Sequence, residues 1–348
     1  MADVRVEALV PSELGEAAAL LARMHARRLE IDPELDGSLA TPEGAAEALR
    51  RELARPRTTA LAARKGQRIV GYLIAQEVLP RPDSLLAKFF APRSGSVSSL
   101  GFAVSESEDL WSVGVALYRA AAQRWLERGI FEHTVRVAAA DSAVLEFWAD
   151  MGFGRKLACG VRDLAPVAAG FGTAEVRPAL GEELEAVVRL ELELARHHAG
   201  SPMFWPHLPE TEEATREFLA GVFEEPRAVH LLAFVDGESV GLCTMLPGGF
   251  APPILPLDGC AYLFIGVVEE GARGRGTGHK VVDAALAWAR ERGFQRCVLH
   301  YATQNFSGAP FWRSLGFRTV EYTLVRRLDE RIAWAVPESS GRGRSPGP

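Results

Sequence analysis

Helical and strand patterns alternate along the chain, and the same order of elements occurs twice. Apolar residues recur at three- and four-residue intervals in 13–28 and again in 181–198, which predicts an amphipathic helix in each stretch. A short strand precedes each of these helices and a second helix follows it. The strands are predicted at 4–9 and 174–180, and the second helices at 44–54 and 211–223.

Each half then continues with strands joined by tight turns. Lys65-Gly66 marks one turn and Asp236-Gly237 the other, and the Asp-Gly pair is a strong hairpin signal. Near the end of each half a strand, a long helix and another strand form a βαβ unit. This order predicts an α/β (α+β) fold in which each half is a mixed, twisted sheet flanked by helices.

The two halves are copies of one domain. At an offset of 164 residues, 13 of the 50 positions from Val104 to Phe153 are identical to those from Val268 to Phe317. We therefore predict a first domain over 1–165, a linker over 163–173 and a second domain over 174–335. The segment 336–348 is rich in Gly, Pro and Ser and is expected to be disordered.

Composition excludes several classes of protein. The net charge of -6, with no dense run of Lys and Arg, argues against nucleic-acid binding. The sequence contains no signal-peptide pattern and no apolar run long enough to cross a bilayer, so we expect a cytoplasmic protein that does not bind membranes. The four widely spaced cysteines predict buried free thiols.

The most distinctive short stretch is ARGRGTGHK, residues 272–280, which follows an apolar strand and precedes a long amphipathic helix. Glycines permit close approach of the backbone to a ligand, and the first N–H groups of a helix attract anions. The two arginines add positive charge, so a diphosphate suits the loop best. A P-loop would need a hydroxyl residue after Lys280, and a dinucleotide-binding loop would follow the first strand of its domain.

The loop Arg273–Gly278 resembles the [QR]xxGx[GA] pyrophosphate motif of the GCN5-related N-acetyltransferases (GNAT superfamily). Val268 precedes it at the family's spacing, although Glu270 replaces the usual proline. A second signature resembles the family further downstream, with Asn305 followed by Ala309 and FWxxLGF at 311–317. The order of elements in both halves is also similar, so the resemblance covers roughly residues 1–330 and suggests a tandem member of the family.

The resemblance implies acetyl-CoA as cosubstrate, bound where the strand before the loop diverges from the strand after it. It implies that backbone N–H groups of the loop hold the pyrophosphate and that the main chain near Val268 pairs with the pantetheine arm. The implied cofactor-binding residues are Val267, Val268, Arg273, Gly274, Arg275, Gly276, Thr277, Gly278, His279, Lys280, Asn305, Phe311 and Trp312.

In the first half, the matching stretch has lost the features of an anion site. It reads ESEDLWSVG, residues 106–114, so Asp109 replaces the arginine and Ser112 replaces the first motif glycine. Carboxylates repel a diphosphate at short range. We predict that only the second half is catalytic, with weak binding through backbone N–H groups of the first half as the alternative.

Acyl transfer to an amine needs a group that accepts the amine's proton. The family often uses a glutamate in the strand at 260–268, but this strand contains none. The candidates are Tyr262, Glu269, His300 and Tyr301, with Asp258 before the strand as a further one, and each could equally be a core or surface residue. The family often has a tyrosine beside the coenzyme A sulfur, where this chain has Trp312, so water, Tyr301 or Tyr322 would protonate the thiolate.

Histidine and aromatic residues gather in the stretch where this fold usually binds its acceptor. The candidates are His197, His198, Phe204, Trp205 and His207, which form either a pocket for a small-molecule amine or a loop packed on the first domain. The spacing of the histidines does not suggest a metal site, and His25 is expected to be structural.

Together these features predict an acetyl-CoA-dependent N-acetyltransferase that acts on a small-molecule amine as a monomer or homodimer. A protein N-acetyltransferase and a non-catalytic acyl-CoA-binding or scaffold protein remain the alternatives.

Overall fold

The computed structural model describes residues 4–167 and 172–334. The first half contains β1 (Arg5–Ala8), α1 (Leu14–Ile31), α2 (Pro42–Leu53), β2 (Thr58–Lys65), β3 (Arg68–Val78), β4 (Ser94–Val104), α3 (Leu110–Glu127), β5 (Glu132–Ala138), α4 (Ser142–Asp150) and β6 (Gly154–Asp163). The second half repeats this order with β7 (Glu175–Pro178), α5 (Leu184–Ala199), α6 (Glu212–Val222), β8 (Val229–Val235), β9 (Glu238–Pro247), β10 (Cys260–Val268), α7 (Thr277–Glu291), β11 (Arg296–Ala302), α8 (Gly308–Ser314) and β12 (Arg318–Arg327).

The predicted mixed sheet with flanking helices is confirmed. Within each half, two of the strands pair in parallel, β4 with β5 and β10 with β11, and the other pairs are antiparallel. The predicted hairpins are present, and Gly66, Asp236 and Gly237 adopt the positive φ values that such tight turns require. The predicted segment 336–348 lies outside the described residues.

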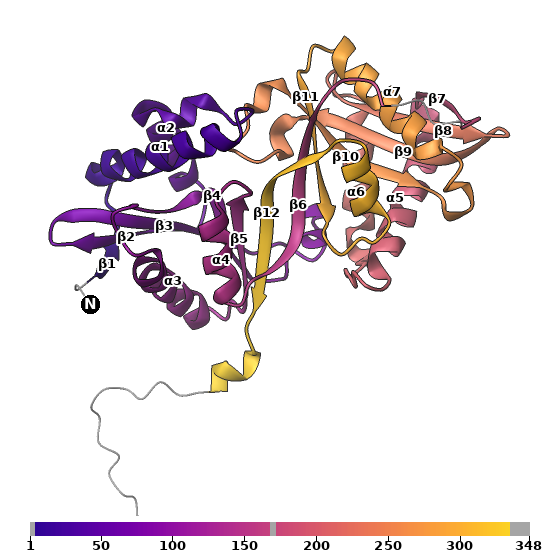
Figure 1. Ribbon diagram of the computed structural model, residues 1–348. Helices are drawn as coiled ribbons and strands as arrows, with labels where there is room; N and C mark the ends of the chain where they lie inside the picture. The colour runs from indigo at the N-terminus through magenta and orange to yellow at the C-terminus, as the bar shows by residue number, and fades with distance from the viewer. Residues whose placement is uncertain (1–3, 168–171, 335–348) are drawn as a thin grey trace, which may run out of the picture.

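The strands of both halves form one sheet, in the order β1-β2-β3-β4-β5-β12-β6-β11-β10-β9-β8-β7 (Figure 1). This order is the same when read from either end, once each strand is replaced by its copy in the other half. The last strand of each half is exchanged: β12 pairs with β5 of the first half, and β6 pairs with β11 of the second. The division into domains at 165 and 174 stays a prediction, because each half contributes a strand to the centre of the other's sheet.

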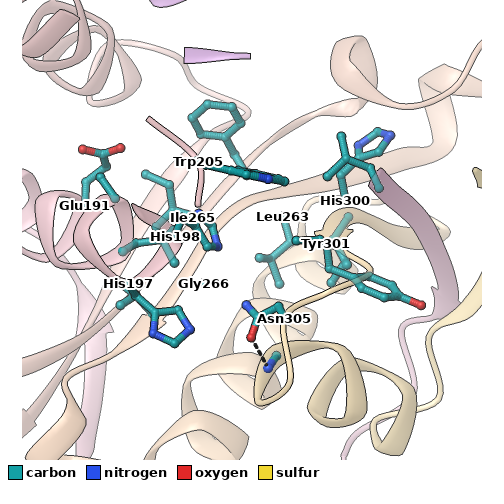
Figure 2. A pocket seen from close by; sticks show the side chains of 18 of the residues that line it. Glu191, His197, His198, Trp205, Leu263, Ile265, Gly266, His300, Tyr301 and Asn305 are labelled. Atoms are coloured by element: carbon teal, nitrogen blue, oxygen red, sulfur yellow. Dashed lines mark hydrogen bonds between the residues drawn. The ribbon is translucent and has the colours of Figure 1, made fainter. Parts of the chain in front are cut away.

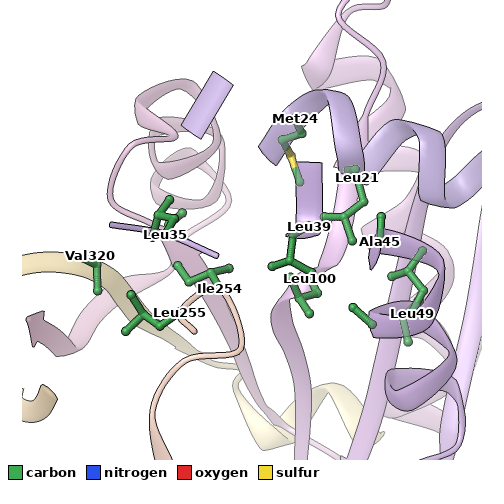
Figure 3. Close-up of a cluster of buried hydrophobic side chains, with 14 of the residues drawn as sticks. Leu21, Met24, Leu35, Leu39, Ala45, Leu49, Leu100, Ile254, Leu255 and Val320 are labelled. Atoms are coloured by element: carbon green, nitrogen blue, oxygen red, sulfur yellow. The ribbon is translucent and has the colours of Figure 1, made fainter. Parts of the chain in front are cut away.

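The hydrophobic core also joins the halves. In the first half, α1 and α2 cover one face of the sheet and α3 and α4 cover the other. Ile254 and Leu255, from the segment between β9 and β10, belong to the same buried cluster as Leu21 and Leu49 of the first half's helices, and lie on the side of it that holds Leu35 (Figure 3). An ion pair adds to this contact, since Arg318 of β12 donates to both carboxylate oxygens of Asp32 at 2.6 and 2.8 Å.

All four cysteines are free and buried, as predicted. None of the helices in 4–167 and 172–334 is long and apolar enough to span a bilayer.

Two buried histidines of the first half predict a loss of stability in acid. His25 Nε2 lies 2.9 Å from Asp36 O, which agrees with its expected structural role, and His133 Nδ1 lies 2.8 Å from Tyr118 Oη. Burial lowers the pKa of both histidines to about 4. Between pH 6.5 and 4 the unfolded chain therefore binds protons that the folded protein does not. The free energy of unfolding should fall on acidification, by at most about 1.4 kcal/mol per pH unit for each histidine.

Urea unfolding measured from pH 7 to pH 4 tests this dependence. In His133→Gln the free energy of unfolding should fall less steeply with acidification, by a slope that corresponds to about one bound proton, because the glutamine does not titrate. Equal stability of the unmodified protein at pH 7 and pH 4.5 would contradict the prediction.

Candidate functional site

A cavity of about 1170 Å³ lies beside the second half's parallel strands and extends under α5 towards the first half (Figure 2). It opens because β10 and β11 diverge. Their parallel pairing ends at Leu263 and Leu299, and a register shift between Leu263 and Ile265 bends β10 at this point. The rest of β10 still pairs with β9 along its other edge. The edge that faces β11 is therefore available to hydrogen-bond an extended ligand.

The glycine loop closes one end of the cavity. Gly274 and Gly276 have φ values of +73° and +81°, so both adopt the left-handed conformation that favours glycine. Gly276 directly precedes α7, and no side chain of the described chain caps this helix. The first N–H groups of α7 are therefore free for an anion. Arg273 is fixed over the loop, because its Nε donates to Val268 O at 2.9 Å.

Most of the residues predicted to bind the cofactor line this cavity. They are Val267, Val268, Arg273, Gly274, Arg275, Gly276, Gly278, His279, Asn305, Phe311 and Trp312. Thr277 is buried in the first turn of α7 and Lys280 donates from its Nζ to Ala174 O at 3.2 Å, and neither residue lines the cavity.

The aromatic pair at 311–312 packs where glycines leave room for it. A Cβ on Gly278 would lie 3.2 Å from the Phe311 ring, and a Cβ on Gly266 would lie 2.8 Å from the Trp312 ring. Asn305 starts α8, because its Oδ1 accepts from the backbone N–H of Gly308 at 2.8 Å. Only the Nδ2 group of Asn305 is thus left to bind a ligand.

The predicted catalytic residues do not all come together. Tyr262 and His300 form a buried pair on the cavity wall, with 2.7 Å between Tyr262 Oη and His300 Nδ1. Burial, with the nearby charge of Arg136, lowers the pKa of His300 to about 3, and burial raises the pKa of Tyr262. Both groups are therefore neutral at physiological pH.

The other two candidates are engaged elsewhere. Tyr301 reaches the cavity, but its hydroxyl lies 3.1 Å from Thr319 Oγ1. Glu269 forms an ion pair with Arg189 and does not line the cavity, and neither does Asp258 or Tyr322.

Four of the five residues predicted to bind the acceptor line the cavity, namely His197, His198, Trp205 and His207. Burial lowers the pKa of His198 to about 4, so this imidazole is neutral, and its ring centroid lies 5.1 Å from that of Trp205. Phe204 points elsewhere, since 71% of its surface is exposed. The described residues contain no group of three or more His, Cys, Asp or Glu that could bind a metal ion.

Two lining residues were missed by sequence reasoning. Glu191 of α5 is 7% exposed and is the one carboxylate among the described residues around the cavity. One of its oxygens accepts from Lys88 of the first half, and the other, Oε2, has no hydrogen-bond partner within 4–167 and 172–334. Arg136 of β5 also faces the cavity. Glu191 could have been suspected, because it occupies the apolar face of its helix together with Val187, Leu190 and Leu194.

The corresponding site of the first half is filled by the protein itself. The Asp109 carboxylate caps α3 by accepting from Ser112 N at 2.9 Å and from Ser112 Oγ at 2.5 Å. The helix N-terminus that would bind an anion is therefore already occupied. Ile254 and Leu255 belong to the buried cluster that contains residues of α1 and α2, and Ile254 O accepts a hydrogen bond from Asp36 N at 2.8 Å.

Comparisons with known proteins agree with this geometry. Residues 192–317 match the family model of the acetyltransferase (GNAT) family. The chain resembles the crystal structure of a GCN5-related N-acetyltransferase from Sphaerobacter thermophilus, with a TM-score of 0.62 and 17% identity over 93% of this chain and 95% of that one. It also resembles a GCN5-related glucosamine N-acetyltransferase region in a fungal multi-domain GH3 β-N-acetylglucosaminidase, with a TM-score of 0.55 and 14% identity over 93% of this chain and 38% of that one. No curated protein matches the sequence significantly.

Proposed function

We propose that this chain, whose residues 192–317 match the acetyltransferase (GNAT) family model, is an acyl-transfer enzyme. On this proposal it transfers the acetyl group of acetyl-CoA to a small-molecule amine. The observation that carries the proposal is the single cavity that joins the uncapped glycine loop to the His197–His207 segment. One end suits a diphosphate, and the other is rich in aromatic and histidine side chains. Small-molecule sites are commonly concave and mostly apolar, with a few polar groups.

The loop and β10 would bind the cofactor through different groups. The pyrophosphate would accept hydrogen bonds from the N–H groups at the start of α7, with Arg273 and Arg275 supplying positive charge. The pantetheine arm would pair with the open edge of β10 at 264–268. A backbone N–H of this edge would then stabilise the negative charge that develops on the thioester oxygen.

Glu191 is our choice for the group that accepts the amine's proton. In the reaction, the amine nitrogen forms a bond to the thioester carbon, the carbon–sulfur bond breaks, and the amine proton passes to the Glu191 carboxylate directly or through water. The thiolate takes a proton from water. Tyr262 and His300 are neutral, so we assign them to hydrogen bonding of the acceptor or of this water.

The first half would play a supporting role without binding a second cofactor, since the Asp109 carboxylate caps the helix that would bind the anion. Isothermal titration should give a stoichiometry of one acetyl-CoA per chain. Binding of a second acetyl-CoA per chain would show that the first half keeps an anion site at 106–114. If the second molecule binds only to an Asp109→Ala variant, the Asp109 carboxylate is what blocks that site.

Thiol release tests the proposed function directly. The protein is incubated with acetyl-CoA and a panel of primary amines, and free coenzyme A is measured against a blank without protein. Release that depends on an amine would support acetyl transfer and exclude a scaffold role. If acetyl-CoA binds but no small amine gives release, the protein is a binding protein or acts on a protein substrate.

A further inference from the structure

The cavity floor crosses from the second half into the first. Backbone pairing aligns Ala302 of β11 with Leu157 of β6, Leu157 with Thr323 of β12, and Thr323 with Arg136 of β5. All four residues line the cavity. Because neighbouring strands lie about 4.8 Å apart, the Arg136 backbone is about 14 Å from that of Ala302. A ligand with its amine near the β10–β11 opening can therefore reach Arg136 only with a group several bonds away.

This part of the cavity has an excess of positive charge. Beyond the glycine loop, the charged lining residues are Lys88, Arg136, Lys156 and Glu191. Lys88 and Glu191 compensate one another in an ion pair. Lys156 lies 5.6 Å from the centre of the Trp205 ring, and the structure gives it no carboxylate partner in the described chain. Two positive charges, those of Arg136 and Lys156, thus face the cavity without a paired anion.

Arg136 lies on β5, the strand that pairs with the exchanged strand β12. Its half-buried guanidinium makes no hydrogen bond or ion pair to any residue within 4–167 and 172–334. Two carboxylates lie near it. Glu52 is already bound by Ser98 Oγ at 2.7 Å and by Arg55 at 2.9 Å. Glu321 is fully buried, and neither of its carboxylate oxygens accepts a geometrically sound hydrogen bond from the described residues. Burial raises its pKa, although the charge of Arg136 acts in the opposite direction, and the net rise favours the neutral form.

Four aromatic rings also line the cavity, those of Phe89, Phe218, Phe250 and Phe264. The ring of Phe264 is at the centre of this group. Its centroid lies 5.0 Å from that of Phe218, 5.4 Å from that of Phe250 and 6.5 Å from that of Phe89 of the first half. The cavity thus combines aromatic surface with a cation that comes from the first half. An arginine in such a setting is suited to bind a carboxylate through two parallel hydrogen bonds.

We infer that the acceptor is an amine bearing a carboxylate several bonds from its nitrogen, and that Arg136 of the non-catalytic half binds this carboxylate. This inference rests on the proposed function, because it names the substrate class of the same site. The first half would thus select the substrate while the second half binds the cofactor.

Two pairs of amines that differ by one carboxylate test the inference. They are 4-(aminomethyl)benzoate with benzylamine and 6-aminohexanoate with hexylamine. We expect kcat/KM to be at least about tenfold higher for the acid of each pair, as charge-assisted hydrogen bonds are typically worth that factor or more. Arg136→Gln should bring this ratio close to one, and Arg136→Lys should leave an intermediate ratio.

Arg155→Gln provides a matched control. Arg155 is an exposed residue of β6 that stacks on Tyr322 and does not line the cavity, so its loss should leave the acid-to-amine ratio unchanged. Stabilisation by acetyl-CoA verifies that each variant is folded.

The outcomes separate the two proposals. Turnover of both members of a pair at equal rates would support the acetyltransferase function and overturn the inference. An acid-to-amine ratio of kcat/KM that stays unchanged in Arg136→Gln would have the same meaning. If no amine is turned over, binding of the four compounds to the coenzyme A complex is measured by titration. Tighter, Arg136-dependent binding of the acids would then support the site while the proposed function fails, and equal binding would overturn both.

Discussion

Replacing Gly276 with aspartate is expected to abolish the stabilisation of the protein by acetyl-CoA. Gly276 has a φ of +81° immediately before α7, where a residue with a Cβ is strained and a carboxylate faces the proposed pyrophosphate position. At a ligand concentration of 100 times Kd, binding stabilises a protein by about 2.7 kcal/mol. The unmodified protein should therefore show a clear rise in Tm with acetyl-CoA, and the variant should show none.

Ser112→Asp is the matched control, since Ser112 occupies the same position in the first half. An acidic residue is well tolerated in the first turn of a helix, so this variant should fold. It should keep the full acetyl-CoA response if the second half alone binds the cofactor. Loss of the response in Ser112→Asp, with retention in Gly276→Asp, would mean that the first half is the active one.

Glu191→Gln should lower kcat by about 10² to 10⁴, the usual contribution of a general base. The amide is nearly the same size as the carboxylate but cannot accept a proton. Binding of acetyl-CoA should change little, because Glu191 lies on α5, away from the glycine loop.

Glu193→Gln is the matched control, because it also removes one negative charge from α5. Glu193 lies two residues further along α5, faces away from the cavity and pairs with Arg196 at 3.6 Å. Its replacement should leave kcat near that of the unmodified protein. If Glu191→Gln also keeps full kcat, the proton must leave by another route, and direct transfer to solvent water becomes the alternative.

Local patterns in the sequence predict the elements of this fold well. The hairpin at Asp236-Gly237 and the helix after the glycine loop depend on short-range signals, such as turn residues and three- to four-residue periodicity. The strand exchange could not be predicted in this way. The stretch 318–327 has the same strand pattern whichever neighbour it pairs with, and its partner β5 lies far away in the sequence.

The residues of the candidate site also differ in how far the sequence predicts them. The glycine loop is continuous in sequence, so its residues and its helix could be predicted together. Glu191 and Arg136 gain their significance only from three-dimensional neighbours, since the first pairs with Lys88 of the other half and the second reaches the cavity through the exchanged strand β12. In the sequence each is an isolated charged residue in a helix or a strand, and nothing there indicates that it lines a cavity.

The exchange of β6 and β12 makes the chain comparable to a homodimer whose two subunits have been fused. In such a dimer each subunit would lend its last strand to the other, and each would be incomplete without its partner. Separate fragments comprising 1–166 and 172–348 should consequently fold poorly alone, because each would expose unpaired strand edges. Mixed together, they should restore one another's sheets and recover acetyl-CoA binding, as the subunits of a strand-swapped dimer do.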